Sequence, residues 1–205
     1  MTYPGQNAYN ASLASYFDGK SRLTPNCIVQ PTTAEEVSTT VKVLAAARLL
    51  KTYQFAVRSG DHTPIPGVNN VDDGVTIDLL HMNRTTYNTD SKVTSIWPAA
   101  RWGSVYAALE PLGRMVAGGR ESTVGVGGFL LGCGISHYAP LFGLSCDNVI
   151  NFQIVLADGR IVNANKKTNA DLFTALKGGN SNFGIVTRYD METFENENLW
   201  GGIVS

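Results

Sequence analysis

Hydrophobic and polar positions along the chain follow two different periods, and the period changes where glycine, proline or asparagine interrupts it. Residues 32–50 place apolar side chains such as Val37 and Val41 at helical spacing, which predicts an amphipathic helix. Thr33 and Glu36 stand three positions apart at its start and can form a capping box. A long helix is therefore the clearest element of the first half.

Short apolar runs rich in β-branched residues predict strands on both sides of this helix. The runs at 27–31 and 54–57 form a β-α-β unit with it. Two further strands are expected at 74–79 and 93–100. Residues 1–24 show no clear period, so we expect an irregular N-terminal segment.

The second half of the chain alternates helices and strands. Two apolar runs within 148–164 are joined through Asp158 and Gly159, a favoured turn pair, and predict a hairpin. We expect two helices, over 101–113 and 169–179, each ended by glycine. A strand is expected over 183–194.

The order of these elements indicates an α+β protein with two lobes, roughly 1–100 and 101–195. Neither an internal repeat nor a Pro/Ser-rich linker separates them. The apolar run that begins at about residue 198 reads as a strand without partners, so we expect the sequence to be part of a longer polypeptide.

Composition limits the class of protein. The chain has 205 residues, of which 43% are hydrophobic and 16% charged, and its formal net charge is -1. This balance gives no electrostatic reason to expect nucleic acid or a membrane as partner. No apolar stretch reaches the ~18 residues of a membrane span, and no basic-then-apolar leader is visible. We expect a cytoplasmic protein if this N-terminus is native, and a secreted one if a signal peptide has been removed.

The cysteines give no chemical signal of their own. Cys27, Cys133 and Cys146 lack metal-ligand spacing, so no metal site is expected, and their odd number leaves one unpaired in any disulfide scheme. We expect all three to be buried free thiols.

Glycine clusters at 58–63, 123–128 and 178–184 are the strongest chemical signal. Glycine lets successive backbone N–H groups approach anionic oxygens that a side chain would keep away. None of the clusters has the Gly-Lys-Ser/Thr end of a P-loop, and VGVGGF does not follow a strand as a nicotinamide-binding fingerprint does. Convergence of the clusters on one long ligand explains them better than three unrelated turns.

Eight segments stand in a fixed order along the chain: PTTAEEV, RSGDH, TIDLLHMN, RWGSVY, GGRESTVGVGGFLLGCGIS, GLSCDNVINFQIVLADGRIVNAN, DLFTALKGGNSNFGIVTRYDMETF and WGG. This ordered set resembles the FAD-binding (PCMH-type) domain of fungal berberine-bridge-enzyme-like FAD-linked oxidoreductases, of the vanillyl-alcohol-oxidase superfamily. The match runs from about Pro25 to Gly202.

The resemblance implies two α+β subdomains, 25–100 and 101–197, with FAD extended between them. It also implies that a C-terminal substrate domain begins near residue 198, at Trp200, and is absent or truncated here. FAD is therefore the expected cofactor.

The family's pyrophosphate loop runs Arg-Ser-Gly-Gly-His, and its histidine bonds to the flavin 8α-methyl carbon. Here Asp61 replaces the second glycine, and its carboxylate would be electrostatically unfavourable beside a pyrophosphate. His62 is the candidate for the covalent link. The resemblance assigns cofactor contacts to Arg58, Ser59, Gly60, Asp61, His62, Thr63, Thr123, Val124, Gly125, Gly127, Gly128, Gly132, Gly134, Ser136, Gly184, Ile185 and Val186.

Many family members carry a second flavin link from a cysteine, and Glu121 stands at that position here. Glutamate cannot form the thioether. Cys133 lies in a helix-like stretch, where we expect it to pack rather than react. We therefore expect one covalent bond, or none.

The resemblance implies hydride transfer from an organic small molecule to flavin, with O₂ as acceptor, in fungal secondary metabolism. Alternatives are a non-catalytic flavin-binding fragment, a half that needs a partner domain or complementary chain, and a secreted carbohydrate or alcohol oxidase. His137, Tyr138 and Glu121 are titratable candidates for a base, but none is assigned that role, so the catalytic residues stay unknown. The substrate cannot be read from the sequence.

Overall fold

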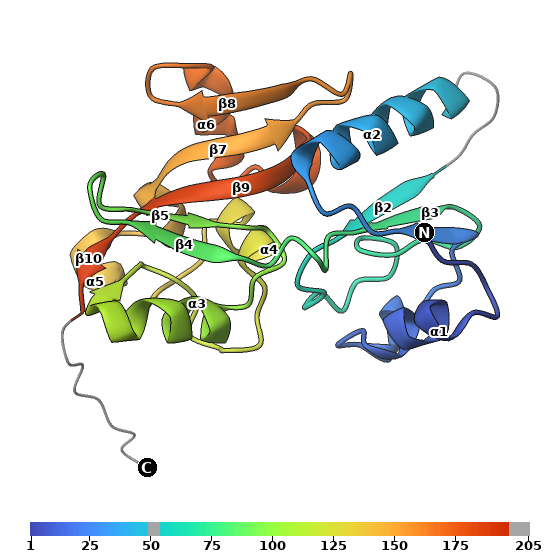
Figure 1. Ribbon diagram of the computed structural model, residues 1–205, viewed down its shortest axis with the longest axis horizontal. Coiled ribbons are helices and arrows are strands. Elements are labelled where there is room, and N and C mark those ends of the chain that lie inside the picture. The colour runs from blue at the N-terminus through green and yellow to red at the C-terminus, as the bar shows by residue number, and fades with distance from the viewer. Residues whose placement is uncertain (49–53, 197–205) are drawn as a thin grey trace, which may run out of the picture.

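The computed structural model describes residues 1–48 and 54–196. Figure 1 shows two lobes side by side, with a long helix above the strands of the first lobe and next to the sheet of the second. The helices are α1 (Asn7–Ala14), α2 (Ala34–Arg48), α3 (Trp102–Leu109), α4 (Val126–Leu131), α5 (Ala139–Phe142) and α6 (Ala170–Leu176). The strands are β1 (Cys27–Val29), β2 (Phe55–Arg58), β3 (Val75–Asp78), β4 (Thr85–Asn88), β5 (Val93–Ile96), β6 (Arg114–Met115), β7 (Val149–Val155), β8 (Ile161–Asn165), β9 (Ile185–Glu192) and β10 (Phe194–Glu195).

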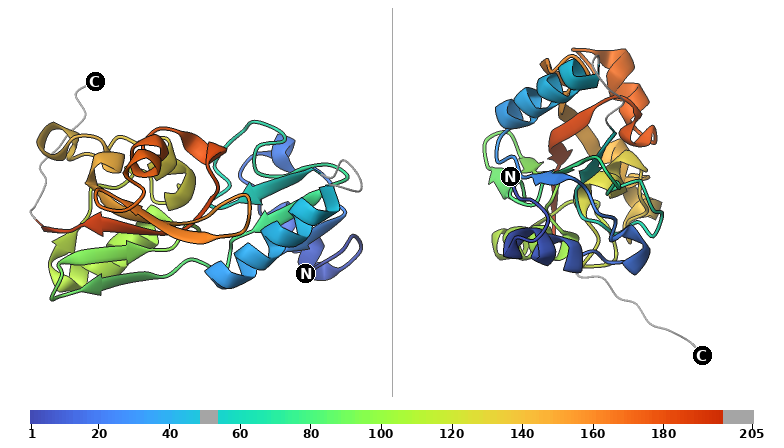
Figure 2. Two further views of the ribbon diagram at one scale, coloured as in Figure 1. Left: turned by 90° about the horizontal axis from the view of Figure 1, so that it is seen from above. Right: turned by 90° about the vertical axis from the view of Figure 1, so that its right-hand side faces the viewer.

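The first lobe is a parallel three-stranded sheet of order β1-β3-β2. Parallel strands need a crossover connection, and α2 supplies it between β1 and β2. Helices α1 and α2 lie on opposite sides of this sheet, as the views of Figures 1 and 2 agree. The predicted β-α-β unit is confirmed, with β3 inserted between its two strands.

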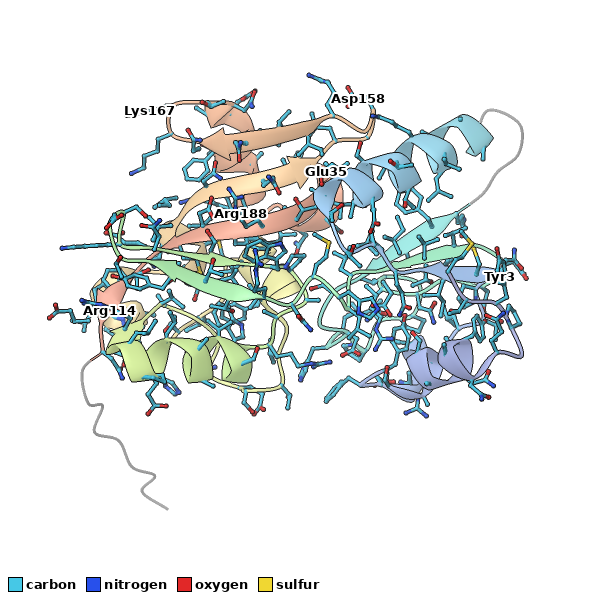
Figure 3. All side chains as sticks on the ribbon, viewed as in Figure 1. Tyr3, Glu35, Arg114, Asp158, Lys167 and Arg188 are labelled. Carbon is cyan, nitrogen blue, oxygen red and sulfur yellow. A yellow bond between two sulfur atoms is a disulfide. The ribbon has the colours of Figure 1, made fainter. Side chains whose placement is uncertain are left out.

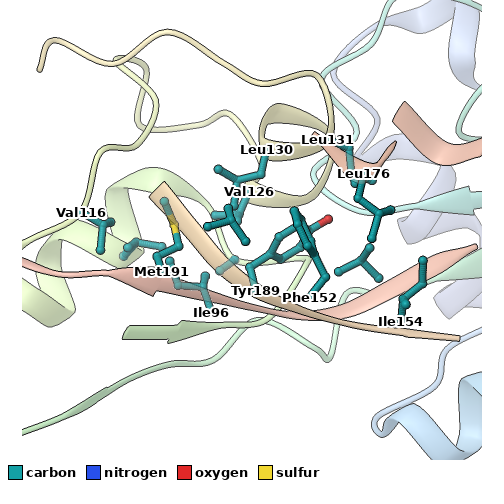
Figure 4. Close-up of a cluster of buried hydrophobic side chains, with 14 of the residues drawn as sticks. Ile96, Val116, Val126, Leu130, Leu131, Phe152, Ile154, Leu176, Tyr189 and Met191 are labelled. Atoms are coloured by element: carbon teal, nitrogen blue, oxygen red, sulfur yellow. The ribbon is translucent and has the colours of Figure 1, made fainter. Parts of the chain in front are cut away.

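The second lobe is an antiparallel five-stranded sheet of order β4-β5-β9-β7-β8. Its core lies between the sheet and helices α3, α4 and α6, and Figure 4 shows part of it around Phe152 and Tyr189. Trp102 and Leu130, from two of these helices, are fully buried in it. The helices and the sheet each bury one face in this core, which accounts for the regular spacing of apolar residues in both.

A second buried cluster joins the two lobes. Val37 and Val41 of α2 pack with Ile77 of β3, and with Val155 and Ile185 of the five-stranded sheet. The apolar face predicted for the helix at 32–50 is therefore the surface of α2 that holds the two lobes together. Figure 3 shows Glu35, at the start of α2, and Asp158, at the tip of the β7–β8 hairpin, on the same side of the molecule.

Local signals placed most of the predicted elements correctly. The hairpin forms β7 and β8, the helix over 169–179 forms α6, and α3 continues through a 3-10 helix to Gly113, whose φ of 63° ends it. The capping box forms only in part. The Thr33 hydroxyl accepts from the Glu36 amide, but the Glu36 carboxylate accepts from Thr32 instead.

Three expectations differ from the structure. The N-terminal segment, expected to be irregular, contains α1. Strand β4 was not predicted, because its residues are half-buried or exposed and carry no apolar face. Strands β4 and β5 belong to the five-stranded sheet, so the boundary between the sheets lies between residues 78 and 85 rather than near residue 100. The segment from 197 onward, with the predicted start of a substrate domain, lies outside the described residues.

The prediction of three free thiols is wrong, because Cys133 and Cys146 form a disulfide. Helix α4 ends before Cys133, which has a φ of 69°, and Gly134 is also left-handed. This turn brings Cys133 beside Cys146, whose amide donates to the Cys133 carbonyl oxygen at 2.9 Å. Cys27 is free and half-buried. Within the described ranges no helix is long and apolar enough to cross a membrane.

The disulfide closes a short loop, so its loss should act mainly through the unfolded chain. Replacing Cys133 and Cys146 with Ser should lower the free energy of unfolding by about 3 kcal/mol. Urea unfolding without reductant measures this change, and Cys27→Ser is the matched control, with little effect expected. Thiol titration of the unfolded, unreduced protein should find one reactive group. Three reactive groups would show that the bond does not form.

Candidate functional site

The glycine clusters at 58–63 and 123–128 are in direct backbone contact. A Cβ atom built on Gly60 would lie 2.2 Å from the Gly125 Cα, and one on Gly125 would lie 2.3 Å from the Gly60 Cα. Real Cβ atoms do not approach backbone so closely, so both positions require glycine. The first two of the three clusters therefore meet, at the junction of the two lobes, and the convergence of all three on one ligand stays a prediction.

The stretch between β5 and α3 holds both loops in place. The Pro98 carbonyl oxygen accepts from the Ser59 hydroxyl at 2.5 Å and from the Gly127 amide at 3.0 Å. The Ala100 carbonyl oxygen accepts from Val126, and the Trp102 amide donates to Val124. One extended segment therefore fixes the spacing of the two glycine loops.

Asp61 is the residue that departs from the family pattern, and its carboxylate is turned inward. Its φ of 54° is a left-handed conformation that glycine, asparagine and aspartate adopt most readily. The Asp61 side chain is 1% exposed and is ion-paired with both Arg58 and Arg101, the latter at 3.1 Å. The expected repulsion of a pyrophosphate by an uncompensated carboxylate does not arise, because two guanidinium groups neutralise it.

Arg58 ties the first loop to the N-terminal helix. Its guanidinium donates to the Ser12 carbonyl and hydroxyl oxygens and to the Ser15 hydroxyl, and it lies over the Tyr16 ring, 3.9 Å from the centroid. Burial raises the pKa of Tyr16, so this phenol stays neutral and donates to the Asn69 carbonyl oxygen. The Arg58 side chain is thus committed to holding the loop, whereas the backbone of the loop is available to a ligand.

The backbone N–H groups of residues 60–63 form no hydrogen bonds with any part of the chain that the structure describes. The Thr63 carbonyl oxygen, in contrast, accepts from the Ser21 hydroxyl. Successive amide donors without a protein acceptor are suited to anionic oxygens. This stretch therefore offers what a pyrophosphate requires.

His62 lies within this row of free amides. Its imidazole stacks on Phe17, with ring centroids 4.0 Å apart and the planes 19° from parallel. Phe17 is exposed, and its ring covers one face of the His62 imidazole.

A pocket of approximately 530 Å³ opens beside the second loop. It is lined by Gly119, Arg120, Glu121, Val124, Phe129, Ile135 and His137. Its walls combine apolar side chains with charged ones, as is usual for a ligand site. The disulfide brackets the segment that carries Ile135 and His137, so it restrains one wall of the pocket.

Glu121 is held by the loop that carries it. Its carboxylate accepts from the amide and hydroxyl of Thr123, at 3.2 and 3.1 Å. These bonds are the largest cause of a lowered pKa for Glu121, and the Ser122 hydroxyl and the nearby His62 add smaller contributions.

The remaining candidates lie in packed surroundings. A Cβ on Gly134 would meet the Phe129 ring at 2.3 Å, and one on Gly184 would meet the Val155 carbonyl oxygen at 2.4 Å. Packing thus accounts for glycine at these two positions. The Ser136 hydroxyl accepts from Tyr138, Gly132 ends α4, and the side chains of Ile185 and Val186 are buried in the core. Their contact with a cofactor stays a prediction.

Sequence reasoning missed Phe17, Tyr16 and Arg101. A signal existed for the N-terminal segment, because Tyr9, Leu13 and Tyr16 recur at helical spacing. The pairing of Arg101 with Asp61, 40 residues away, had no local signal.

Comparison with known proteins agrees with this geometry. Residues 25–165 match the family model described as FAD binding domain. The chain is 45% identical over 205 residues to the FAD-dependent monooxygenase sdcF of Emericella nidulans, covering 100% of this chain and 42% of that protein. It is 42% identical over 205 residues to the FAD-dependent monooxygenase CTB5 of Cercospora beticola, covering 98% of this chain and 39% of that relative.

Solved structures show the same fold. The 6-hydroxy-D-nicotine oxidase of Arthrobacter nicotinovorans superposes with a TM-score of 0.86 at 27% identity, over 95% of this chain and 42% of that chain. The carbohydrate oxidase of Microdochium nivale gives 0.85 at 30% identity, over 95% of this chain and 41% of that chain.

The chain belongs to the FAD binding domain family, and the resemblance to berberine-bridge-enzyme-like oxidoreductases of the vanillyl-alcohol-oxidase superfamily is confirmed. The α+β, PCMH-type fold expected from that resemblance is confirmed as well. The chain spans only about two fifths of the length of these relatives.

The contact between the loops predicts a sharp difference between two glycines. Gly60→Ala should lower the free energy of unfolding by about 2–3 kcal/mol, because its Cβ would overlap Gly125. Gly128→Ala is the matched control, since a Cβ there meets nothing within 4 Å and alanine favours the helix. Chemical denaturation of both variants measures the effect. Equal stability of the two would contradict the close contact.

Proposed function

We propose that this chain binds FAD along the junction of its two lobes, as the cofactor domain of a flavin-dependent oxidoreductase. The observation that carries the proposal is the row of free amides at 60–63, held against the second glycine loop beside a neutralised Asp61. A pyrophosphate needs such donors and the absence of an uncompensated carboxylate. The donor set therefore fits this cofactor.

Each part of the site has a distinct task in this proposal. The amides of 60–63 hold the pyrophosphate, and the backbone of 123–128 closes over the cofactor from the second lobe. The pocket that contains Val124 and Phe129 receives the flat ring system, with His62 and Glu121 nearby. When bound, FAD supplies hydride acceptance from a substrate carbon and reoxidation by O₂.

The covalent attachment and the remaining contacts are part of the same proposal. His62 is the attachment point, and Thr63, Thr123, Gly127, Gly132, Ser136 and the 184–186 stretch are further contacts. Phe17 shields the His62 imidazole from water on one face.

The proton-accepting group and the substrate pocket are proposed to come from a further domain or a complementary chain. Glu121 is engaged by Thr123, and His137 lies on the wall of the pocket without an acidic partner to orient it among the described residues. The substrate is a small organic molecule. Fungal relatives named FAD-dependent monooxygenases favour secondary metabolism over the secreted carbohydrate or alcohol oxidase.

A flavin-binding domain without turnover is the second candidate function. The observation in its favour is that the described part of the chain contains no completed acid–base pair over the pocket. Substrate-free photoreduction of bound flavin would proceed in both cases, whereas reduction by any organic donor requires the complete enzyme. The two candidates share the cofactor site.

His62 provides the direct test of the cofactor site. Wild-type protein should keep its yellow colour after acid denaturation, and a flavin-bearing peptide should contain His62. His62→Ala should release all of its flavin on denaturation while unfolding at nearly the same temperature, because a half-buried loop side chain contributes little to the core. Absorption at the flavin band and peptide mass spectrometry measure both results. Protein that never acquires flavin would refute the proposed function.

Glu121→Cys tests the orientation of the second position. If residue 121 faces the flavin ring beside His62, the introduced thiol should form a second attachment, so that His62→Ala no longer releases flavin in the double variant. Glu110→Cys is the matched control, because Glu110 is exposed and does not line the pocket. Attachment by neither thiol would show that residue 121 does not face the flavin.

A further inference from the structure

We propose that Asp61 is a positioning residue for His62. Its buried carboxylate, held by Arg58 and Arg101, clamps the first glycine loop between the N-terminal helix and the second loop, and so sets the place of the imidazole. This inference rests on the proposed function only in its effect on flavin attachment; the clamp itself belongs to the protein without cofactor.

The first step is the position of Asp61 within its loop. It stands between Gly60, which touches Gly125, and His62, which stacks on Phe17. A displacement of Asp61 therefore moves both neighbours at once. Its left-handed φ of 54° directs the side chain inward, where it is 1% exposed.

The second step is that the two arginines belong to different parts of the molecule. Arg58 is bonded to Ser12 and Ser15 at the end of α1. Arg101 donates to the Thr123 carbonyl oxygen and forms a backbone bridge with Gly125. Asp61 is the acceptor that both share, so it joins the N-terminal helix to the second glycine loop.

The third step is the charge balance of this cluster, in which the Arg58, Asp61 and Asp78 side chains are buried and the Arg101 side chain is 42% exposed. Arg58 and Arg101 face Asp61 and Asp78, two positive groups against two negative ones. Asp78 is 3.8 Å from the Arg58 guanidinium and accepts from Ser12. Without Asp61, the carboxylate left to Arg58 is the more distant one of Asp78, and Arg101 loses the carboxylate that it pairs with. A buried charge left without its partner is costly, so the loop would rearrange.

Two substitutions separate charge from backbone conformation. Asp61→Asn keeps the shape and tolerates the left-handed φ, but removes the charge. Asp61→Gly removes the side chain and gives the backbone its full freedom. If residue 61 serves only as a left-handed turn, glycine should do as well as aspartate. If the clamp operates, both variants should fail in the same way.

The matched control is Asp190→Asn on β9. Asp190 pairs with Arg188 at 2.9 Å and accepts from Ser95 and Asn151, so it is also a well-bonded carboxylate in an ion pair. Figure 3 labels Arg188 on β9, in the five-stranded sheet of the second lobe. This substitution should reduce stability without disturbing His62.

The experiment uses the full chain and two readouts. In flavin-free protein, amide hydrogen exchange of peptides covering 59–63 and 122–127 should become about tenfold faster in Asp61→Asn and Asp61→Gly, and stay unchanged in Asp190→Asn. In flavin-loaded protein, the acid-stable flavin per folded molecule should fall about tenfold in both Asp61 variants and not in the control. Arg101→Met should reproduce part of the loss, and adding it to Asp61→Asn should cause no further loss.

Unchanged exchange in both loops would overturn the clamp. Normal flavin attachment in Asp61→Gly would overturn the positioning role, even if that variant were less stable. A wild-type protein that binds no flavin would refute the proposed function instead, and the exchange measurement would still decide whether the clamp exists.

Discussion

The close approach of Gly60 and Gly125 is the constraint on which the rest of the site depends. Two backbones can meet at this distance only where neither carries a Cβ, and here the contact joins the loop after β2 of the parallel sheet to the loop before α4 in the second lobe. The Pro98 carbonyl oxygen and the paired arginines of Asp61 hold the two loops in register. The approach of Gly60 to Gly125 therefore fixes the relative position of the two glycine loops that a ligand at the junction would touch.

Local signals predicted much of the fold because they depend on neighbouring residues. The spacing of Val37 and Val41, the Asp158-Gly159 turn and the left-handed Gly113 each specify a conformation within a few positions. Strand β4 carries no such signal, since its sequence TTYN buries no continuous face and is recognised only through its pairing with β5.

The site shows the same division between local and distant information. The positions of the glycines in the sequence were enough to predict that these loops approach one another. The neutralisation of Asp61 depends on Arg101, and the Cys133–Cys146 bond depends on a turn at Cys133 and Gly134. Both are contacts between side chains that only the folded chain brings together. The sequence around Asp61 and around Cys133 therefore predicted the wrong surroundings for each.

The order of strands in the five-stranded sheet has a consequence for how the protein is made. Strand β5 pairs with residues 189–192 of β9, and β9 in turn pairs with β7, so the central strand of the sheet is synthesised after the other four strands. Until then β4 and β5 have a bare edge, and the β7–β8 hairpin has no neighbour. Assembly of this lobe therefore waits for β9 and is dominated by distant pairing, which makes it slow and places its exposed strands within reach of chaperones.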